Sequence, residues 1–443
     1  MSSSGRSVWQ AQAPACTPNP PLIGERKADV VVVGAGFSGL SAAWHVKQID
    51  PAASVIVIEA REVGFGASGR AAGNCFSLFG ESLEVVRLVY GRERTIAAHR
   101  YVREALRYLA QLVEHEKMDS DYEPREFWRV ATSERLTRRL RATHDSYREL
   151  GLGEGYEWIP APRMRESFPR SPFREGLAEK DCALLDPLKH VREWKRLCEE
   201  AGVAIFESTP LLGLERARPL AITTPTGRLR ADRVVLGTNA YSHLLDGLPE
   251  LRCKQSVVWT HMIATEPLRA EQRAAIGWKE GQGLYDGLQQ LHYFRLTPDG
   301  RVCFGGGAPG VTTAAELHDG SSAAVWSQLE RRLARYFPPL EGIRIEHRWK
   351  GPVSVCADMA PAMGFLKDER VLFSCGFVGH GIPITQLNGK TAAQMICGQS
   401  SELTAFWGVN RRVLPWLPRP LDYWVKRAVL AAMRARDIWD QAA

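Results

Sequence analysis

The residues best suited to chemistry in this sequence form a glycine-rich turn near its start, which comprises Gly34, Gly36, Phe37, Ser38 and Gly39. Four consecutive valines precede the turn, a helix-like pattern follows it, and Glu59 closes a second apolar run about twenty residues later. The first glycine permits a tight turn, the second lets a pyrophosphate approach the backbone, and the third lets the helix pack on the strand. An acid in the position of Glu59 binds a pair of ribose hydroxyls. The pattern therefore predicts a dinucleotide site.

Two further stretches suit an extended dinucleotide. The small-residue loop after Glu59 can place a hydroxyl and a guanidinium on phosphates or on a flavin edge, through Ala67, Ser68, Gly69 and Arg70. Near the carboxyl end a short apolar run leads into a second glycine-rich turn before a helix, and its residues are Gly376, Gly379, His380, Gly381 and Ile382. Each helix start offers N–H groups and a positive dipole end to a negative group. Two such starts favour FAD over NAD, with the second facing the N1–C2=O edge of the flavin.

The elements that must position these residues alternate between strand and helix patterns. Strand-like runs precede both turns and recur across 203–236, whereas 83–113 and 187–201 carry helical spacing. Residues 246–345 are richer in strand patterns and aromatic side chains. We expect an α/β fold (α+β overall), in which a discontinuous Rossmann-like FAD-binding domain carries an inserted β-rich, helix-flanked substrate domain.

The expected domain boundaries follow these changes in pattern. They are an N-terminal extension at 1–27, a FAD-binding domain at 28–85, 185–245 and 346–405, a substrate or cap domain at 86–184 and 246–345, and a C-terminal helical tail at 406–443. Trp9 is a candidate anchor for the extension. The basic helix expected at 421–436 should pack on the body of the protein rather than on a membrane.

The composition argues against several classes of protein. The formal net charge of +7 is spread along the chain without a basic block, so nucleic-acid binding is not indicated. Nine cysteines form no CxxC pair, which argues against a zinc site or a disulfide scaffold, and we expect no metal. The N-terminus lacks the apolar core of a signal peptide, and no transmembrane segment is expected. The cysteine pattern fits a cytoplasmic protein.

The ordered set of motifs resembles the D-amino-acid oxidase, glycine oxidase and sarcosine oxidase superfamily of FAD-dependent amine oxidoreductases, most closely its γ-glutamylputrescine oxidoreductase branch. The motifs are Gly34–Gly39 with Glu59, Gly66–Arg70, Thr209-Pro210, Thr238-Asn239-Ala240, Trp349–Pro352 before Asp358, and Gly376–Gly381. The resemblance implies FAD contacts along both glycine-rich turns and the intervening loop, at Leu211 beside the adenine, and at Asn239.

Departures from the family pattern bear on how the cofactor is held. Arg70 stands where some relatives carry a histidine that bonds covalently to the flavin, and Gly351 stands where others carry a flavin-linked cysteine. The resemblance therefore implies non-covalent FAD. Cys75, Cys356 and Cys375 lie in stretches expected near the flavin and are the thiols that a covalent link would use.

The substrate side carries weaker signals. Glycine oxidase has an arginine for the α-carboxylate just before the segment matching Pro352–Asp358, where this chain has Lys350, which lacks the planar fork for bidentate capture. Lys350 could act as a point charge, and Arg295 matches an arginine of the family pattern that serves either the substrate or the structure. His380 and His261 are the titrating side chains in these stretches, as catalytic bases or as structural groups.

The expected function is FAD-dependent oxidation of the C–N bond of a primary or secondary amine, such as a γ-glutamyl amine, a polyamine-like amine or an N-alkyl amino acid. A hydride passes to flavin N5 and the imine hydrolyses, with oxygen as the acceptor and H₂O₂ as the product. The lysine that activates oxygen in sarcosine oxidases would fall near Phe304-Gly305, where no lysine stands. One alternative is therefore a dehydrogenase that passes electrons to a quinone or protein carrier. Another is a non-catalytic FAD-binding redox-sensing or assembly protein.

Overall fold

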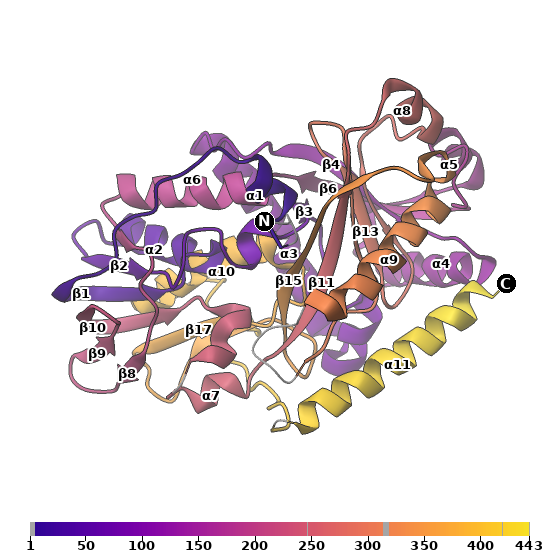
Figure 1. Ribbon diagram of the computed structural model, residues 1–443. Coiled ribbons are helices and arrows are strands. Elements are labelled where there is room, and N and C mark those ends of the chain that lie inside the picture. The colour runs from indigo at the N-terminus through magenta and orange to yellow at the C-terminus, as the bar shows by residue number, and fades with distance from the viewer. Residues whose placement is uncertain (1–4, 246, 313–318, 419, 443) are drawn as a thin grey trace.

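Two β-sheets lie side by side in the computed structural model, which describes residues 5–245, 247–312, 319–418 and 420–442 (Figure 1). Sheet A, at the left of Figure 1, carries the first glycine-rich turn, and sheet B, at the right, carries the aromatic strands. The mixed α/β class expected from the sequence is confirmed.

Parallel pairing makes up the centre of sheet A, whose strand order is β16-β17-β10-β1-β2-β7, with β8 and β9 beside β10. The strands are β1 Gly24–Val33, β2 Val55–Ile58, β7 Ala204–Phe206, β8 Gly213–Glu215, β9 Leu220–Thr223, β10 Gly227–Leu236, β16 Ala362–Phe365 and β17 Val371–Cys375. β1 pairs in parallel with β2 on one side and with β10 on the other, and β10 pairs in parallel with β17. The carboxyl ends of these strands therefore meet at one edge, and the chain order switches between β1 and β10, which is where such sheets bind ligands.

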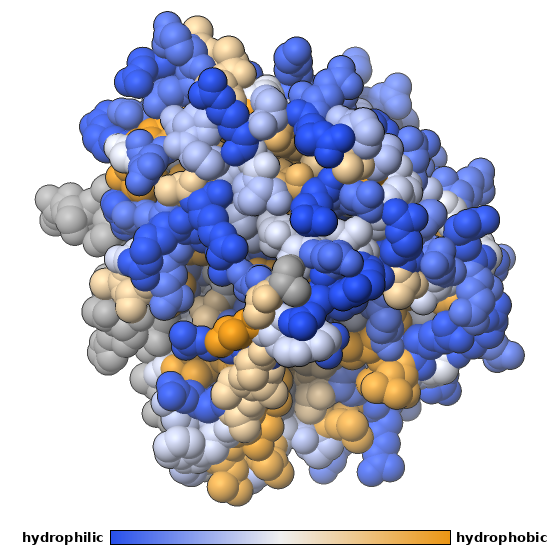
Figure 2. Space-filling view, turned by 90° about the vertical axis from the view of Figure 1, so that its right-hand side faces the viewer, coloured by the Kyte–Doolittle hydropathy of each residue, from blue (hydrophilic) through white to orange (hydrophobic). Residues whose placement is uncertain are grey.

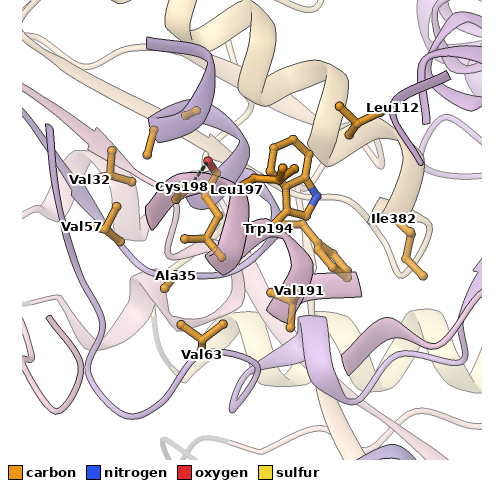
Figure 3. Packing of buried hydrophobic residues seen from close by; sticks show 14 of the residues in the cluster. Val32, Ala35, Val57, Val63, Leu112, Val191, Trp194, Leu197, Cys198 and Ile382 are labelled. Atoms are coloured by element: carbon orange, nitrogen blue, oxygen red, sulfur yellow. Dashed lines mark hydrogen bonds between the residues drawn. The ribbon is translucent and has the colours of Figure 1, made fainter. Parts of the chain in front are cut away.

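The valines of β1 are buried because both faces of sheet A are covered. One face packs on the helices α2 (Phe37–Ile49), α6 (Pro187–Glu200) and α10 (Gly381–Ile396). Figure 3 shows this core, in which Val32 and Val57 of the sheet lie beside Leu197 and Cys198 of α6. Asp186 begins α6 by accepting hydrogen bonds from two backbone N–H groups of its first turn.

Helices α2 and α10 cross at very short range, which fixes the two glycine-rich turns relative to each other. Ser41 Oγ donates to the Gln386 carbonyl at 2.8 Å. A Cβ on Gly389 would lie only 2.2 Å from Ser41 Oγ, so a glycine is required at the crossing.

Sheet B has the strand order β15-β11-β14-β13-β12-β4-β6-β3, with β5 paired to β6. The strands are β3 Asn74–Cys75, β4 Glu123–Val130, β5 Tyr156–Ile159, β6 Gly176–Leu184, β11 Ser256–Thr265, β12 Gly283–Asp286, β13 His292–Leu296, β14 Val302–Gly306 and β15 Ile345–Val355. The expected cap segment 86–184 thus supplies β4, β5 and β6. β15 pairs along its length with β11, although the sequence placed its residues in the FAD-binding domain.

Alternate residues of sheet B face different cores. Met262 packs into the core shared with sheet A, whereas Ile263 packs into a second core beneath α9 (Asp319–Tyr336). We call these the inner and outer faces of sheet B. On β15, Trp349 belongs to the inner face, because it pairs with Met262 and lies in the same core.

Shorter elements and the remaining helices complete the fold. They are α1 Val8–Gln12, α3 Leu83–His115 with a break in helical geometry at Gly91, α4 Glu134–Glu149, α5 Ala161–Ser167, α7 Pro249–Arg252, α8 Ala270–Ile276, α11 Leu421–Gln441, and the 3₁₀ turns η1 Ala67–Gly69, η2 Gly153–Gly155, η3 Asn239–Leu244 and η4 Pro338–Leu340. None of the helices, as far as residues are described, has the length and apolar character needed to cross a membrane.

The N-terminal extension is built into the fold rather than lying loosely on its surface. Ser7 caps α1 and donates its hydroxyl to the Gly69 carbonyl at 2.8 Å. The buried Trp9 donates Nε1–H to the Ala71 carbonyl at 2.9 Å. The extension therefore holds the loop that follows Glu59.

Candidate active site

The first glycine-rich turn and Glu59 meet at the carboxyl edge of sheet A. Glu59 Oε2 accepts the Ala35 N–H at 2.8 Å, and Oε1 accepts the Arg61 N–H at 3.1 Å. Burial raises the pKa of Glu59, and these backbone donors oppose the shift. Each carboxylate oxygen keeps a further lone pair, so Glu59 can also accept ribose hydroxyls.

The geometry of the turn requires its glycines. Gly34 has φ +99°, in the left-handed region, and a Cβ on Gly39 would lie 1.9 Å from the Gly34 carbonyl oxygen. The backbone at Thr209 lies next to Glu59, because the Thr209 N–H donates a hydrogen bond to the Glu59 carbonyl at 2.7 Å. Leu211 follows and is half-buried, beside the position expected for the adenine.

The loop after Glu59 returns to the start of α2. Ser68 Oγ accepts the Phe37 N–H at 3.1 Å, so this hydroxyl lies where the sequence places a phosphate. The Arg70 guanidinium instead donates to the carbonyls of Phe65, Gly5 and Lys350. Those bonds hold the loop against the N-terminal extension and β15.

The second glycine-rich turn leads from β17 into α10. The Gly376 N–H donates to Asn239 Oδ1 at 3.2 Å and to Ser354 Oγ at 3.1 Å. Gly379 has φ +87°, and among the described residues no side chain caps α10. The start of α10 can therefore stabilise a negative group through its dipole and N–H groups.

His380 immediately precedes α10 and is held by the loop before α3. Its Nδ1–H donates to the Gly80 carbonyl at 3.0 Å, which leaves Nε2 without a proton in the neutral ring. Burial lowers the pKa of His380 to about 4, although the bond to Gly80 opposes this shift. The ring also meets Phe76 edge-on, with centroids 5.2 Å apart.

Aromatic residues on the inner face of sheet B continue from Phe76. Phe76 stacks on Tyr285 at 5.3 Å, and Tyr285 is paired with Tyr293 on the next strand. The Tyr293 hydroxyl lies 2.9 Å from Thr260 Oγ1. An aromatic wall thus approaches the start of α10, and such walls are typical of small-molecule chambers.

His261 and Lys350 do not share this inner face. They pair with each other one position away from Met262 and Trp349, so both lie on the outer face. His261 contacts Ser322 Oγ at 2.9 Å and Trp326 of α9, and Lys350 Nζ lies 5.8 Å from the Trp259 ring centroid. Burial lowers the pKa of His261 to about 4. Their placement supports structural roles.

Arg295 lies on the inner side of sheet B and donates hydrogen bonds to backbone carbonyls. Its guanidinium donates to Leu185 at 2.7 Å and to Gly73 at 3.3 Å, and it lies over the Trp9 ring. Burial lowers the pKa of Arg295. This placement supports the structural role that the sequence left open.

The three thiols expected near the flavin, Cys75, Cys356 and Cys375, are buried. Burial raises the pKa of Cys75 and contributes, after the Cys356 hydrogen bond, to raising that of Cys375. A protonated thiol is a poor nucleophile. Within the described residues, no three His, Cys, Asp or Glu side chains come together as a metal site.

The residues at this edge fit FAD. Glu59 has lone pairs for a ribose, α2 and α10 present two helix starts, and Gly34, Gly39 and Gly237 approach one another closely beside the first of them. The family model described as FAD dependent oxidoreductase matches residues 29–395. The chain belongs to this family. The FAD dependent oxidoreductases act as enzymes on amines and amino acids, and FAD is the cofactor.

Individual FAD dependent oxidoreductases resemble the chain over most of its length. It is 26% identical over 397 residues to the "Probable oxidoreductase OrdL" of Haemophilus influenzae, covering 88% of each chain. It is also 26% identical over 407 residues to the gamma-glutamylputrescine oxidoreductase of Escherichia coli, covering 92% of each. The glycine oxidase structure from Geobacillus kaustophilus has a TM-score of 0.73 at 17% identity, covering 87% of this chain and 99% of that one.

Sequence reasoning missed the aromatic wall at Phe76 and Tyr285 and the cation beside it, Arg129. Phe76 follows a two-residue strand, and Tyr285 lies in a four-residue strand, so neither has enough residues for a periodic pattern. Arg129 lies between the fully buried Trp128 and Val130, and this alternation of apolar and charged residues is the pattern in the sequence that could have identified it.

Proposed function

We propose that this protein oxidises the C–N bond of a primary or secondary amine to an imine that hydrolyses. Bound FAD supplies the hydride acceptor at N5. The observation that carries the proposal is the meeting of α10 with the aromatic wall of sheet B through His380, Phe76 and Tyr285. A helix start that favours anionic charge then lies beside an apolar chamber for the amine.

The proposed FAD contacts follow the carboxyl edge of sheet A. Glu59 holds the ribose, the start of α2 and Ser68 hold the pyrophosphate, and the start of α10 faces the flavin ring. We propose non-covalent binding because the pKa values of the Cys75 and Cys375 thiols are raised, which disfavours the nucleophilic thiolate at both positions. We also propose a cytoplasmic location.

The proposed substrate carries no free carboxylate on the reacting carbon. The two cations that the sequence offered for such a carboxylate are engaged elsewhere, because Arg295 binds carbonyls and Lys350 lies on the outer face. A γ-glutamyl or polyamine-like amine therefore fits better than an N-alkyl amino acid. The similarity to an enzyme named for gamma-glutamylputrescine supports the same class.

Oxygen is the proposed electron acceptor, with H₂O₂ as the product. A quinone or protein carrier is the second candidate, because Gly305 on the inner face lies against Met262 and Tyr293, where a Cβ would come within 2.7 Å of each. This packing leaves no room at Gly305 for an oxygen-activating lysine. Stopped-flow mixing of the substrate-reduced enzyme with oxygen separates the two acceptors.

Anaerobic titration of the holoenzyme with γ-glutamyl amines, polyamines, N-methyl amino acids and D-amino acids tests the proposal. Bleaching of the oxidised flavin absorption by an amine is the expected result. If no amine bleaches the flavin while binding of a partner protein depends on FAD, a redox-sensing or assembly role replaces the proposed function.

A further inference from the structure

A guanidinium that the mechanism does not use lies beside the aromatic wall. Arg129 is on β4, where the neighbouring Trp128 and Val130 pack into the outer core beneath α9. Arg129 therefore projects from the inner face. Its guanidinium carbon lies 5.8 Å from the Tyr285 ring centroid.

Arg129 is charged, half-buried and unpaired. Its Nε is buried without a hydrogen-bond partner, and none of the described residues forms an ion pair with its guanidinium within 4.0 Å. Two carboxylates act on it only from longer range, and both have other partners, because Glu81 accepts the Ser82 N–H and Glu84 accepts the Thr143 hydroxyl. Arg125, on the same strand, pairs with Glu123 at 3.1 Å instead. A buried donor without an acceptor is unfavourable, so Arg129 is poised for an anion from a ligand.

The position of Arg129 sets how far that anion lies from the reacting bond. Arg129 pairs with Tyr285, and Tyr285 pairs with Tyr293, so two strand spacings of about 4.8 Å separate Arg129 from Tyr293. Aromatic rings line the way, from His380 through Phe76 to Tyr285. An amine reacting near the start of α10 would reach Arg129 only through an extended chain.

We propose that Arg129 binds a carboxylate at the far end of an extended amine substrate. This inference rests on the proposed function and names its substrate class. Arginine's planar fork matches a carboxylate in a bidentate manner.

Matched substrates test the proposal on the holoenzyme. ω-Amino carboxylates of increasing chain length and the corresponding carboxamides are compared by anaerobic flavin reduction, in the wild type and in Arg129→Gln, Arg129→Lys and the control Arg125→Gln. We expect the wild type and Arg125→Gln to prefer long carboxylates over carboxamides by about tenfold or more. Arg129→Gln should lose this preference while retaining the carboxamide rate, and Arg129→Lys should keep part of it.

Calorimetric titration with hexanoate and hexanamide adds a readout that needs no turnover. Tighter binding of hexanoate that Arg129→Gln abolishes supports the proposal. Equal use of carboxylates and carboxamides by the wild type, or a preference unchanged in Arg129→Gln, overturns it. If no amine reduces the flavin at all, the proposed function fails, and the titration still decides whether Arg129 binds a carboxylate.

A second, independent observation concerns α11, which packs on the body through its polar face. Asp422 and Lys426 bond to each other and to Ser256, and the Asp437 carboxylate accepts the N–H groups of Gln289 and Gln290. All of the acidic residues of α11 are buried in this way. The expected packing of this helix on the body is therefore observed, but with its charged side inward.

The outward face of α11 is apolar along its length. Its exposed apolar residues recur every three or four positions, and they are Leu421, Trp424, Val425, Ala428, Val429, Ala431, Ala432, Ala435, Ile438 and Trp439. Orange and pale-orange side chains form a band down the lower half of Figure 2, where α11 lies. Trp424 is 64% exposed and Ile438 is 61% exposed, although both are large.

The charges beside this face identify what covers it. The exposed charged residues of α11 are all arginines, namely Arg427, Arg434 and Arg436. A second copy of the helix would bring only like charges to the contact, whereas an anionic lipid surface complements them. Tryptophan near both ends of the face suits the interface between water and lipid. We propose that α11 lies on an anionic phospholipid surface with its apolar face inserted.

Sedimentation of the full chain with vesicles tests this proposal. We expect binding to vesicles of equimolar phosphatidylcholine and phosphatidylglycerol, and about tenfold weaker binding in the double variant Trp424→Gln/Ile438→Gln and on pure phosphatidylcholine. Leu88→Gln, an exposed leucine on α3, is the matched control and should bind like the wild type. Absent binding, or binding unchanged in the double variant, overturns the proposal. A dimer that the double variant dissociates would also overturn it and assign the face to a second copy.

Discussion

At the scale of single residues, the Glu59 carboxylate offers the sharpest test of how the cofactor is held. Glu59→Gln should weaken FAD binding by about tenfold or more, because one acceptor oxygen becomes an NH₂ group facing the backbone donor of Ala35 or Arg61. Titration of the apoprotein with FAD, followed by flavin fluorescence, measures the change. Glu62→Gln, on an exposed neighbour, should bind FAD normally, and equal losses in both variants would contradict the assignment.

The protonation state of His380 leads to a prediction about the pH dependence of catalysis. Burial holds its pKa near 4, so the ring is neutral throughout pH 5–8 and its protonation cannot shape the rate in that range. Anaerobic stopped-flow measurements should show no inflection near the ordinary histidine pKa. An inflection there that His380→Gln removes would show that the ring titrates during turnover.

At the scale of elements, the crossing of α2 and α10 couples stability to cofactor binding. Gly389→Ala should lower the free energy of unfolding by about 1–3 kcal/mol, because its Cβ would lie 2.2 Å from Ser41 Oγ and force the two helices apart. The midpoint temperature of thermal unfolding and the flavin content of the purified protein should both decline. Gly213→Ala is the control, since no atom lies within 4 Å of its Cβ position.

A second prediction at this scale concerns how the N-terminal extension holds the loop after Glu59. Trp9→Ala should loosen the loop after Glu59, because it removes both the bond to the Ala71 carbonyl and the ring beneath Arg295. We expect faster FAD release on dialysis and faster proteolysis between residues 64 and 73. Trp9→Phe keeps an aromatic ring and should release FAD at an intermediate rate. If both variants behave like the wild type, the extension does not hold the loop of the cofactor site.

Elements whose full pattern lies within one stretch of the sequence could be predicted. Features that depend on which strand or sheet a segment packs against could not. The turn at Gly34 and the helix start at Gly381 follow from strand, glycine and helix in direct succession. The two faces of sheet B depend on which side meets sheet A, so His261 and Lys350 were plausible site residues until β11 and β15 were paired. β4 was missed because its first half is not buried and carries charges, at Glu123 and Arg125.

At the scale of the whole molecule, buried histidines predict acid sensitivity. Burial lowers the pKa of His45 to about 3 and those of His99, His190 and His261 to about 4. The unfolded chain binds protons at these positions below about pH 6.5 and the folded chain does not, so stability is lost as pH falls from 6.5 towards 5. Each histidine lowers the free energy of unfolding by up to about 1.4 kcal/mol per pH unit of acidification in this range.

Urea unfolding at several pH values between 5 and 8 checks this slope. His190→Gln should show a shallower fall in unfolding free energy on acidification, by roughly one histidine's share. A pH-independent stability across this window would mean that the rings bind protons as readily in the folded protein as in the unfolded chain.

The strand order of sheet A also determines when this protein can fold during synthesis. β1 and β2 leave the ribosome early, but on the other side of β1 the sheet continues with β10, from residues 227–236, and then with β17, from residues 371–375. Most of the chain must be translated before the sheet closes, and pairing across such sequence separations is slow. The nascent chain therefore exposes an unpaired edge of valines for much of its synthesis. Slower production at lower temperature should raise the yield of flavin-loaded protein, since the proposed flavin contact at the start of α10 follows β17, the last of these strands.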